Sequence, residues 1–173
     1  GITGVTAFIR GQNPGPLIAL RADIDGLPVT EKLNLPFSSK AKTNYQGNEV
    51  GVMHACGHDA HIAVLLGVAS FLSQNTDKLK GDILLIFQPA EEGAPEGEEG
   101  GAELMLKQGL FEAEKPDAIF GMHVSNFKNG QIWTKPGPIM ASAEAFRITV
   151  QGQQTHGSRP WSGVDPIIAA ADI

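Results

Sequence analysis

Three short apolar runs, each followed within four residues by acidic or histidine side chains, constrain the fold of this chain most strongly. The runs cover residues 17–22, 83–87 and 118–122. A run of four to eight apolar residues is typical of a strand buried on both faces, as in a covered parallel sheet. Segments with helical spacing separate the runs. We therefore predict an α/β fold in which helices cover both faces of a central sheet.

Other segments fit this architecture. Apolar residues from Asp59 to Gln74 have the spacing of a largely buried helix, and a second helix is expected from about Ala102 to Gln108, with Gly109 as its C-terminal cap. Residues 4–9 predict a further strand, separated from the 17–22 strand by turn residues. A long polar loop is expected through Asn48.

The character of the sequence changes near residue 143. Residues 144–151 alternate polar and apolar side chains, which predicts a strand with one face in solvent. Asp165 and Pro166 have the residue types of a helix cap and first turn. We expect one domain over residues 1–142 and the start of a second over residues 143–173. Because the chain opens without methionine and stops in this helix, we expect a fragment that lacks a short N-terminal and a longer C-terminal piece.

Composition narrows the classes of partner. The net charge of -6 argues against binding to nucleic acid or to an anionic membrane surface, and favours a small metabolite. No apolar run approaches the ~18 residues of a membrane span. The single cysteine, Cys56, excludes an intrachain disulfide. Together with the lack of a secretory signal, this favours a reducing, cytoplasmic location.

Cys56 and His58 form the first candidate site. A thiolate and an imidazole on either side of Gly57, which lets the backbone fold tightly, can both reach one metal ion. A buried cysteine beside a structural histidine is the plain alternative. A Cys–His nucleophilic pair is another, but it needs an orienting residue and an oxyanion hole, which the sequence adjacent to Cys56 does not offer.

The strand ends supply further candidates. Glu91 and Glu92 follow a buried strand, where two adjacent carboxylates are costly unless a positive charge balances them. Their side chains point in different directions, so one can bind a metal while the other faces a reacting water. His123 ends another apolar run, and carboxyl ends of strands are where α/β proteins bind ligands. Thiolate, imidazole and carboxylate together suit zinc or a similar ion.

Asp23 and Asp25 follow the strand predicted over residues 17–22. We interpret them as carboxylates that accept the free N–H of a metal-binding imidazole and so orient it. Direct metal ligands and surface aspartates before a turn are the two alternatives.

Four motifs together resemble the aminoacylase-like amidohydrolases, which include hippurate hydrolases, bacterial N-acyl-amino acid amidohydrolases and plant auxin-conjugate hydrolases, within the carboxypeptidase G-like metallopeptidases. The motifs are Arg21-Ala22-Asp23-Ile24-Asp25-Gly26-Leu27-Pro28, His54-Ala55-Cys56-Gly57-His58-Asp59, Gln88-Pro89-Ala90-Glu91-Glu92 and Thr155-His156-Gly157. The resemblance implies a zinc-aminopeptidase-like catalytic domain with a central mixed sheet, followed by the start of a small α+β satellite domain that forms a homodimer.

The resemblance also implies the roles of single residues. Cys56 matches a shared ligand of a pair of divalent ions (zinc, or manganese, cobalt or nickel), and Glu91 matches the catalytic carboxylate. His156 matches a satellite-domain histidine that reaches the substrate carbonyl across the dimer. The further metal ligands that the resemblance implies are His58, Glu92 and His123. A last histidine ligand is expected beyond residue 173.

The expected reaction is metal-dependent hydrolysis of the amide bond of an N-acyl amino acid, with Glu91 as general base. Three other functions use the same residues: a metallo-dipeptidase or carboxypeptidase, an N-acetyl-diaminopimelate deacetylase, and a non-catalytic metal-binding relative. A metal-free Cys–His hydrolase is the last alternative, and a chelator separates it from the others.

Overall fold

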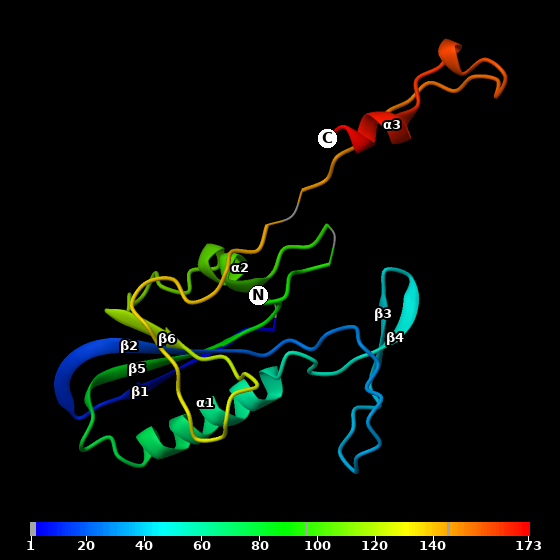
Figure 1. Cartoon of the computed structure of the whole chain (residues 1–173). Coiled ribbons are helices and arrows are strands. Elements are labelled where there is room, and N and C mark those ends of the chain that lie inside the picture. The colour runs from blue at the N-terminus through cyan, green and yellow to red at the C-terminus, as the bar shows by residue number, and fades with distance from the viewer. Residues whose placement is uncertain (1–2, 96, 145) are drawn as a thin grey trace. The chain divides into compact units, whose positions relative to one another are not determined.

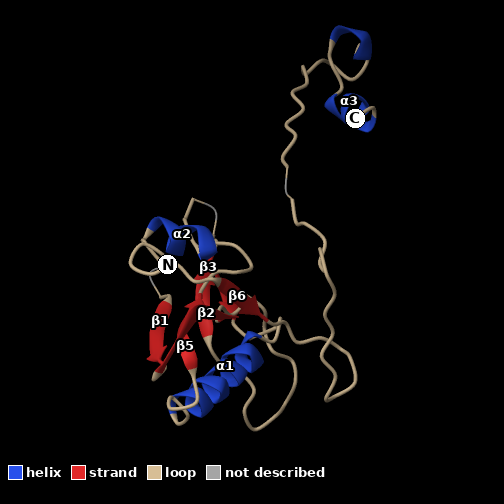
Figure 2. Ribbon diagram, turned by 90° about the vertical axis from the view of Figure 1, so that its left-hand side faces the viewer, coloured by secondary structure: helices blue, strands red, loops and turns tan. Residues whose placement is uncertain are grey.

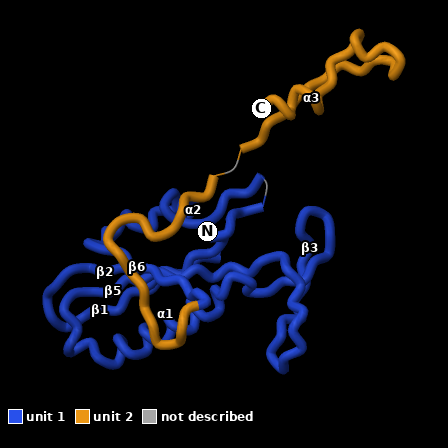
Figure 3. The backbone as a smooth tube through the Cα atoms, in the orientation of Figure 1, with its two compact units in different colours: residues 1–126 blue, residues 127–173 orange. Residues whose placement is uncertain are grey.

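The computed structural model describes residues 3–95, 97–144 and 146–173. The elements, in chain order, are β1 (Val5–Arg10), β2 (Asn13–Asp23), β3 (Lys42–Tyr45), β4 (Asn48–Gly51), α1 (His58–Ser73), β5 (Lys80–Gln88), α2 (Gly101–Lys107), β6 (Ala118–Gly121), the 3-10 helix η1 (Pro160–Ser162) and α3 (Pro166–Ala171) (Figure 1). The chain divides into two compact units, residues 1–126 and 127–173, which Figure 3 colours separately.

The first unit is built on a four-stranded sheet with the order β1-β5-β2-β6. Strand β5 is antiparallel to β1 and parallel to β2, and β2 is parallel to β6. The sheet is therefore mixed, as the resemblance implied. Strand β5 lies between the two strands that come first in the chain, so β1 and β2 do not pair with each other. The apolar runs of β2 and β5 pair directly, with Ala19 opposite Leu84 and Ala22 opposite Phe87.

Both faces of the sheet are covered, which confirms that part of the prediction. Side chains alternate along β5. Leu84 and Ile86 pack with Met105 of α2, whereas Ile83 and Leu85 pack with Leu65 of α1. Figure 2 shows α1 and α2 on opposite faces of the sheet.

Burial is lower than the sequence predicted in two elements. Helix α1 was expected to be largely buried, but among its residues only His58, His61 and Leu65 are buried, and Phe71 is 66% exposed. A helix that packs on one face of a sheet buries only one stripe. Strand β6 was expected to be buried, but Phe120 is 60% exposed, because β6 is one of the two edge strands of the described sheet.

The polar loop expected through Asn48 contains β3 and the turn of the β3–β4 hairpin, and β4 continues past it to Gly51. Its two turn residues, Gln46 and Gly47, have φ angles of 50° and 80°. Positive φ at both central positions defines the type I′ turn that matches the twist of a two-residue hairpin. Gln-Gly is not among the dipeptides that usually signal this turn, so the hairpin was missed.

In the second unit, helix α3 begins as the sequence predicted. The backbone N–H of Ile167 donates to Asp165 Oδ1 at 2.8 Å, so Asp165 is its N-terminal cap. The strand predicted over residues 144–151 is absent from residue 144 and from residues 146–151, and residue 145 lies outside the described residues. The domain boundary at residue 143 stays a prediction. Over the described ranges, no helix is long and apolar enough to cross a membrane.

Candidate metal centre

The candidate site lies where the parallel strands of the first unit end. Strands β2, β5 and β6 run in the same direction, so the segments that follow them meet at one edge of the sheet. Helix α1 begins at this edge with His58, whose ring is 6.3 Å from that of His123, measured between centroids. Side chains that are far apart in sequence are thereby brought together.

Gly57 allows one of these approaches, between Cys56 and His123. It is the N-cap of α1, with φ of 80°, and a Cβ atom built there would lie 2.5 Å from Cγ2 of Val124. A side chain at this position would therefore push away the segment that follows β6. With glycine, Cys56 Sγ lies 3.4 Å from His123 Nε2.

The Cys56 thiol is in an acidic environment. A hydrogen bond with Glu92, partial burial and the nearby charge of Glu91 raise the pKa of Cys56 to about 11. The thiol is consequently protonated at neutral pH when no cation is near. A divalent cation reverses this balance because it favours the thiolate and is favoured by the carboxylates.

His58 carries the least satisfied polar atom at the site. Its side chain is 1% exposed, and Nε2 has no hydrogen-bond partner among the described residues. This nitrogen is 3.9 Å from Glu91 Oε2 and 3.9 Å from Glu92 Oε1. These distances are too long for hydrogen bonds, and an unpaired buried nitrogen normally costs about 1–3 kcal/mol.

Asp25 contacts the other ring nitrogen of His58, Nδ1. Nδ1 of His58 donates to the backbone carbonyl and to Oδ1 of Asp25, both at 3.1 Å. The proton is therefore on Nδ1, which leaves the lone pair of Nε2 free for a cation. Oδ2 of Asp25 accepts the backbone N–H of Glu92 at 3.1 Å, and His54 Nδ1 donates to the same Asp25 carbonyl at 3.0 Å. Asp25 thus links the segment after β2 to His58 and Glu92.

Asp23 has different contacts. It is 1% exposed and contacts His61 Nδ1 through Oδ1 and Arg21 Nη1 through Oδ2. Burial alone would raise the pKa of Asp23, but the hydrogen bond from His61 and the charge of Arg21 outweigh it and lower that pKa. Sequence reasoning assigned no role to His61, which is 1% exposed. Its spacing of three residues from His58 places both on one face of α1, and that was the available signal.

The spacing of these groups fits a bound metal. Among the described residues, ligand-type atoms within 4.8 Å of one another form three overlapping groups, which share His58. In a tetrahedral site with bonds of about 2.1 Å, neighbouring ligand atoms lie about 3.4 Å apart. The separations of 3.4 and 3.9 Å given above are of this order. The groups are Cys56, His58 and His123; His58, Glu91 and Glu92; and Asp23, His58 and His61.

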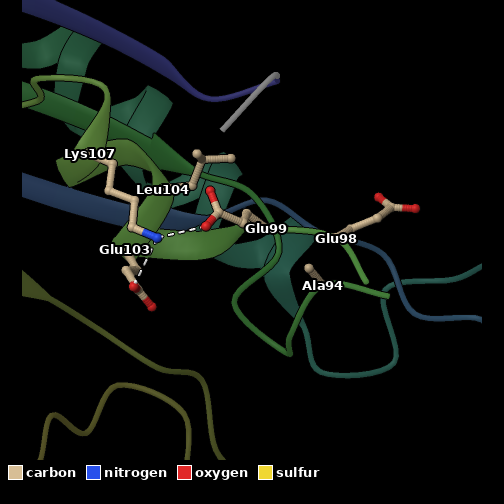
Figure 4. A pocket seen from close by; sticks show the side chains of 7 residues that line it. Ala94, Glu98, Glu99, Glu103, Leu104 and Lys107 are labelled. Atoms are coloured by element: carbon tan, nitrogen blue, oxygen red, sulfur yellow. Dashed lines mark hydrogen bonds and ion pairs between the residues drawn. The ribbon is translucent and has the colours of Figure 1, made fainter. Parts of the chain in front are cut away.

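The remaining catalytic candidate, His156, lies in the second unit. It is exposed, and its Nδ1 is 2.8 Å from Ser158 Oγ. The first unit also has a hollow of about 260 Å³ (Figure 4). Its residues come from the loop before α2 and from α2 itself, where Lys107 pairs with Glu99 at 2.7 Å. None of the candidate site residues lines it.

The fold and this cluster define a class: an α/β protein that gathers thiol, imidazole and carboxylate groups at the carboxyl edge of a mixed sheet, as metal-dependent hydrolases do. The sequence profile of peptidase family M20/M25/M40 matches residues 19–171, and the chain belongs to this family.

Proteins similar to this chain are named for several different hydrolase activities. The chain is 47% identical over 172 residues to thermostable carboxypeptidase 1 of Saccharolobus solfataricus and 44% identical to N-acetyl-L-cysteine deacetylase of Bacillus subtilis. It spans 99% of its own length in both matches, but 40% and 38% of theirs. The chain also resembles the solved structure of the YXEP protein of Bacillus subtilis, with 48% sequence identity and a TM-score of 0.59. That protein is described as a dinuclear metal binding peptidase of the M20 family. That match covers 71% of this chain and 30% of the other.

Proposed function

We propose that this chain forms the metal-binding half of an amidohydrolase that cleaves the amide bond of N-acyl amino acids. The observation that carries the proposal is the buried, unpaired Nε2 of His58, which faces Glu91 and Glu92 at 3.9 Å. The Cys56–His123 contact at 3.4 Å lies at the same edge. A buried imidazole held as the Nδ1–H form, beside two carboxylates, is arranged to bind a cation.

Cys56, His58, Glu92 and His123 are the residues that would hold a pair of divalent ions. Their mixture of sulfur, nitrogen and oxygen atoms suits zinc, and manganese, cobalt or nickel can occupy such a set. Bound ions of this kind supply Lewis acidity, which polarises a carbonyl and lowers the pKa of water toward neutrality.

Glu91 is proposed as general base and then general acid. It takes a proton from the attacking water, whose oxygen forms a bond to the amide carbon, and returns a proton to the departing amine as the carbon–nitrogen bond breaks. The products are a carboxylic acid and a free amino acid. The Glu91 side chain is 37% exposed, so water and substrate have access to it.

His156 is proposed as a donor to the substrate carbonyl, supplied by a small satellite domain that begins near residue 143 and forms a homodimer. A hydrogen-bond donor to a developing oxyanion typically contributes ~3 kcal/mol to the stability of the transition state. His156 is exposed within the second unit, as a residue that meets substrate must be.

A carboxypeptidase is the second candidate, because a relative with that name is 47% identical to this chain. Both reactions hydrolyse an amide next to an amino acid and differ in the acyl group. A non-catalytic metal-binding protein is the third, and the presence of Glu91 beside Glu92 argues against it, because such a protein has no use for a base.

The test uses the full-length protein. Bound metal is measured by elemental analysis, and release of free amino acid is assayed on hippurate, several N-acetyl-amino acids and dipeptides, with and without a chelator. We expect about two transition-metal ions per chain and chelator-sensitive release from the N-acyl substrates. Release from dipeptides alone would favour the carboxypeptidase, and bound metal without any release would favour the non-catalytic alternative. Activity that survives complete removal of metal would refute the proposal.

A further inference from the structure

A chain of hydrogen bonds runs behind the candidate metal centre and connects the segments that carry its residues. Arg21 Nε donates to Gln88 Oε1, and Arg21 Nη1 donates to Asp23 Oδ2, both at 3.0 Å. His61 Nδ1 contacts Asp23 Oδ1, and the backbone N–H of Val124 donates to His61 Nε2 at 2.9 Å. This series of hydrogen bonds thus joins the ends of β5 and β2 to helix α1 and to the segment after β6.

The direction of these hydrogen bonds defines which tautomer His61 adopts. Because Val124 donates an N–H to Nε2, that nitrogen carries a lone pair, and the proton of the neutral ring is on Nδ1. Nδ1 then donates to Asp23, which is itself held by Arg21. Asp23 and Arg21 therefore present His61 as an acceptor to the Val124 amide.

Val124 in turn positions His123. Nδ1 of His123 donates to the Val124 carbonyl at 2.7 Å, which leaves Nε2 of His123 toward Cys56. The main chain of Val124 is therefore bound on one side by His61 and on the other by His123. The ring of His61 also packs edge-on against that of His123, with centroids 4.7 Å apart.

We infer that His61 is a positioning residue that fixes the His123 segment through the Val124 amide, and that it is not itself a metal ligand. The inference rests on the proposed metal centre. The atoms of Asp23, His58 and His61 are close enough for a third ligand group, but both nitrogens of His61 are already used. A nitrogen that accepts an N–H has no lone pair left for a metal.

Three substitutions distinguish the contributions of the two ring nitrogens of His61. His61→Gln places an amide oxygen near the position of Nε2 and can still accept the Val124 N–H. His61→Asn places an amide near the position of Nδ1, so it keeps a partner for Asp23 but loses the bond to Val124. His61→Leu loses both bonds at similar volume.

The assay is binding of Co²⁺ alone to the metal-free full-length protein, followed by its visible absorption, which reports the ligands and geometry of the ion. Circular dichroism and a thermal melt check that each variant is folded. We expect His61→Leu and His61→Asn to weaken Co²⁺ binding about 10–100-fold and to change the spectrum, as loss of an orienting partner does. His61→Gln should bind within a few-fold of the wild type with the same spectrum.

The outcomes are distinct. Wild-type affinity and spectrum in folded His61→Leu would overturn the inference and leave the metal centre standing. Equal loss in His61→Gln and His61→Asn would also overturn it, because that result makes His61 a ligand. If His61→Leu does not fold, the Gln and Asn variants decide alone, with at least tenfold tighter binding by Gln as the supporting result. Failure of the wild type to bind Co²⁺ would refute the proposed function as well.

Discussion

Replacement of Gly57 by alanine is the sharpest single test of the geometry at the start of α1. Gly57 has a φ of 80° and a ψ of 19°, in the left-handed region. The added Cβ would also lie 2.5 Å from Val124 Cγ2. Adding one methyl group therefore has two separate energetic costs, backbone strain and a steric clash. The clash is with Val124, the residue that follows His123.

The magnitude follows from the two costs. The left-handed conformation costs an L-residue about 1–2 kcal/mol, and overpacking by one methyl group costs about 1–3 kcal/mol. Gly57→Ala should therefore lower the free energy of unfolding by about 2–5 kcal/mol. Val124→Ala removes the Cγ2 atom, so the double variant should carry only the backbone cost of about 1–2 kcal/mol relative to Val124→Ala.

The assay is urea denaturation of the metal-free full-length protein for the wild type, both single variants and the double variant. The four values form a double-mutant cycle, whose coupling energy measures the contact between position 57 and Val124. Coupling of about 1–3 kcal/mol is expected. A loss below about 0.5 kcal/mol for Gly57→Ala, or zero coupling, would refute the reasoning.

Three further predictions concern single groups. Glu91→Gln should lower turnover at least about 100-fold while bound metal, measured by elemental analysis, stays at the wild-type level; near-normal turnover would remove Glu91 from the mechanism. With the pKa of Cys56 raised from 9.0 to about 11, the thiolate fraction at pH 8 falls about a hundredfold. The higher nucleophilicity of the more basic thiolate offsets part of this loss, so iodoacetamide should label the metal-free protein about tenfold more slowly, and the rate should rise until the pH passes about 11. A rate equal to that of a small-molecule thiol with a pKa of 9 would contradict the acidic environment described for Cys56. Asp165→Ala removes the cap of α3 and should lower the stability of the second unit by about 1 kcal/mol, read from backbone hydrogen exchange in α3, with Asp172→Ala at the other end of the helix as the matched control; equal exchange in both variants would refute the capping role.

The sequence predicted the carboxyl ends of the strands and the main helices well, because these features are local. The start of β2 was predicted wrongly: the residues expected as a turn before Leu17 belong to the strand, which begins at Asn13. An apolar run followed by Glu91 or His123 is visible in a few residues, and so is the cap at Asp165. The mixed sheet was expected from resemblance alone, since no local signal shows that β5 separates β1 from β2.

Features that depend on distant neighbours were missed or wrong. The contact of His61 with Asp23 joins residues 38 positions apart, and the bond from Val124 joins residues 63 apart. The burial of β6 was overestimated because the sequence of an apolar strand does not show whether the strand lies at the centre or at the edge of a sheet. No short-range pattern carries that information.

The place of β5 in the sheet has a consequence for synthesis of the chain. Val5 pairs with Phe87, and Ala22 also pairs with Phe87 from the other side. Until β5 leaves the ribosome, neither of the first two strands has its partner, and their apolar faces have no sheet to join. Loop closure over so many residues makes such pairings slow. During this interval the nascent chain exposes the kind of surface that chaperones bind, so folding of the first unit should be the step most sensitive to translation speed and chaperone supply.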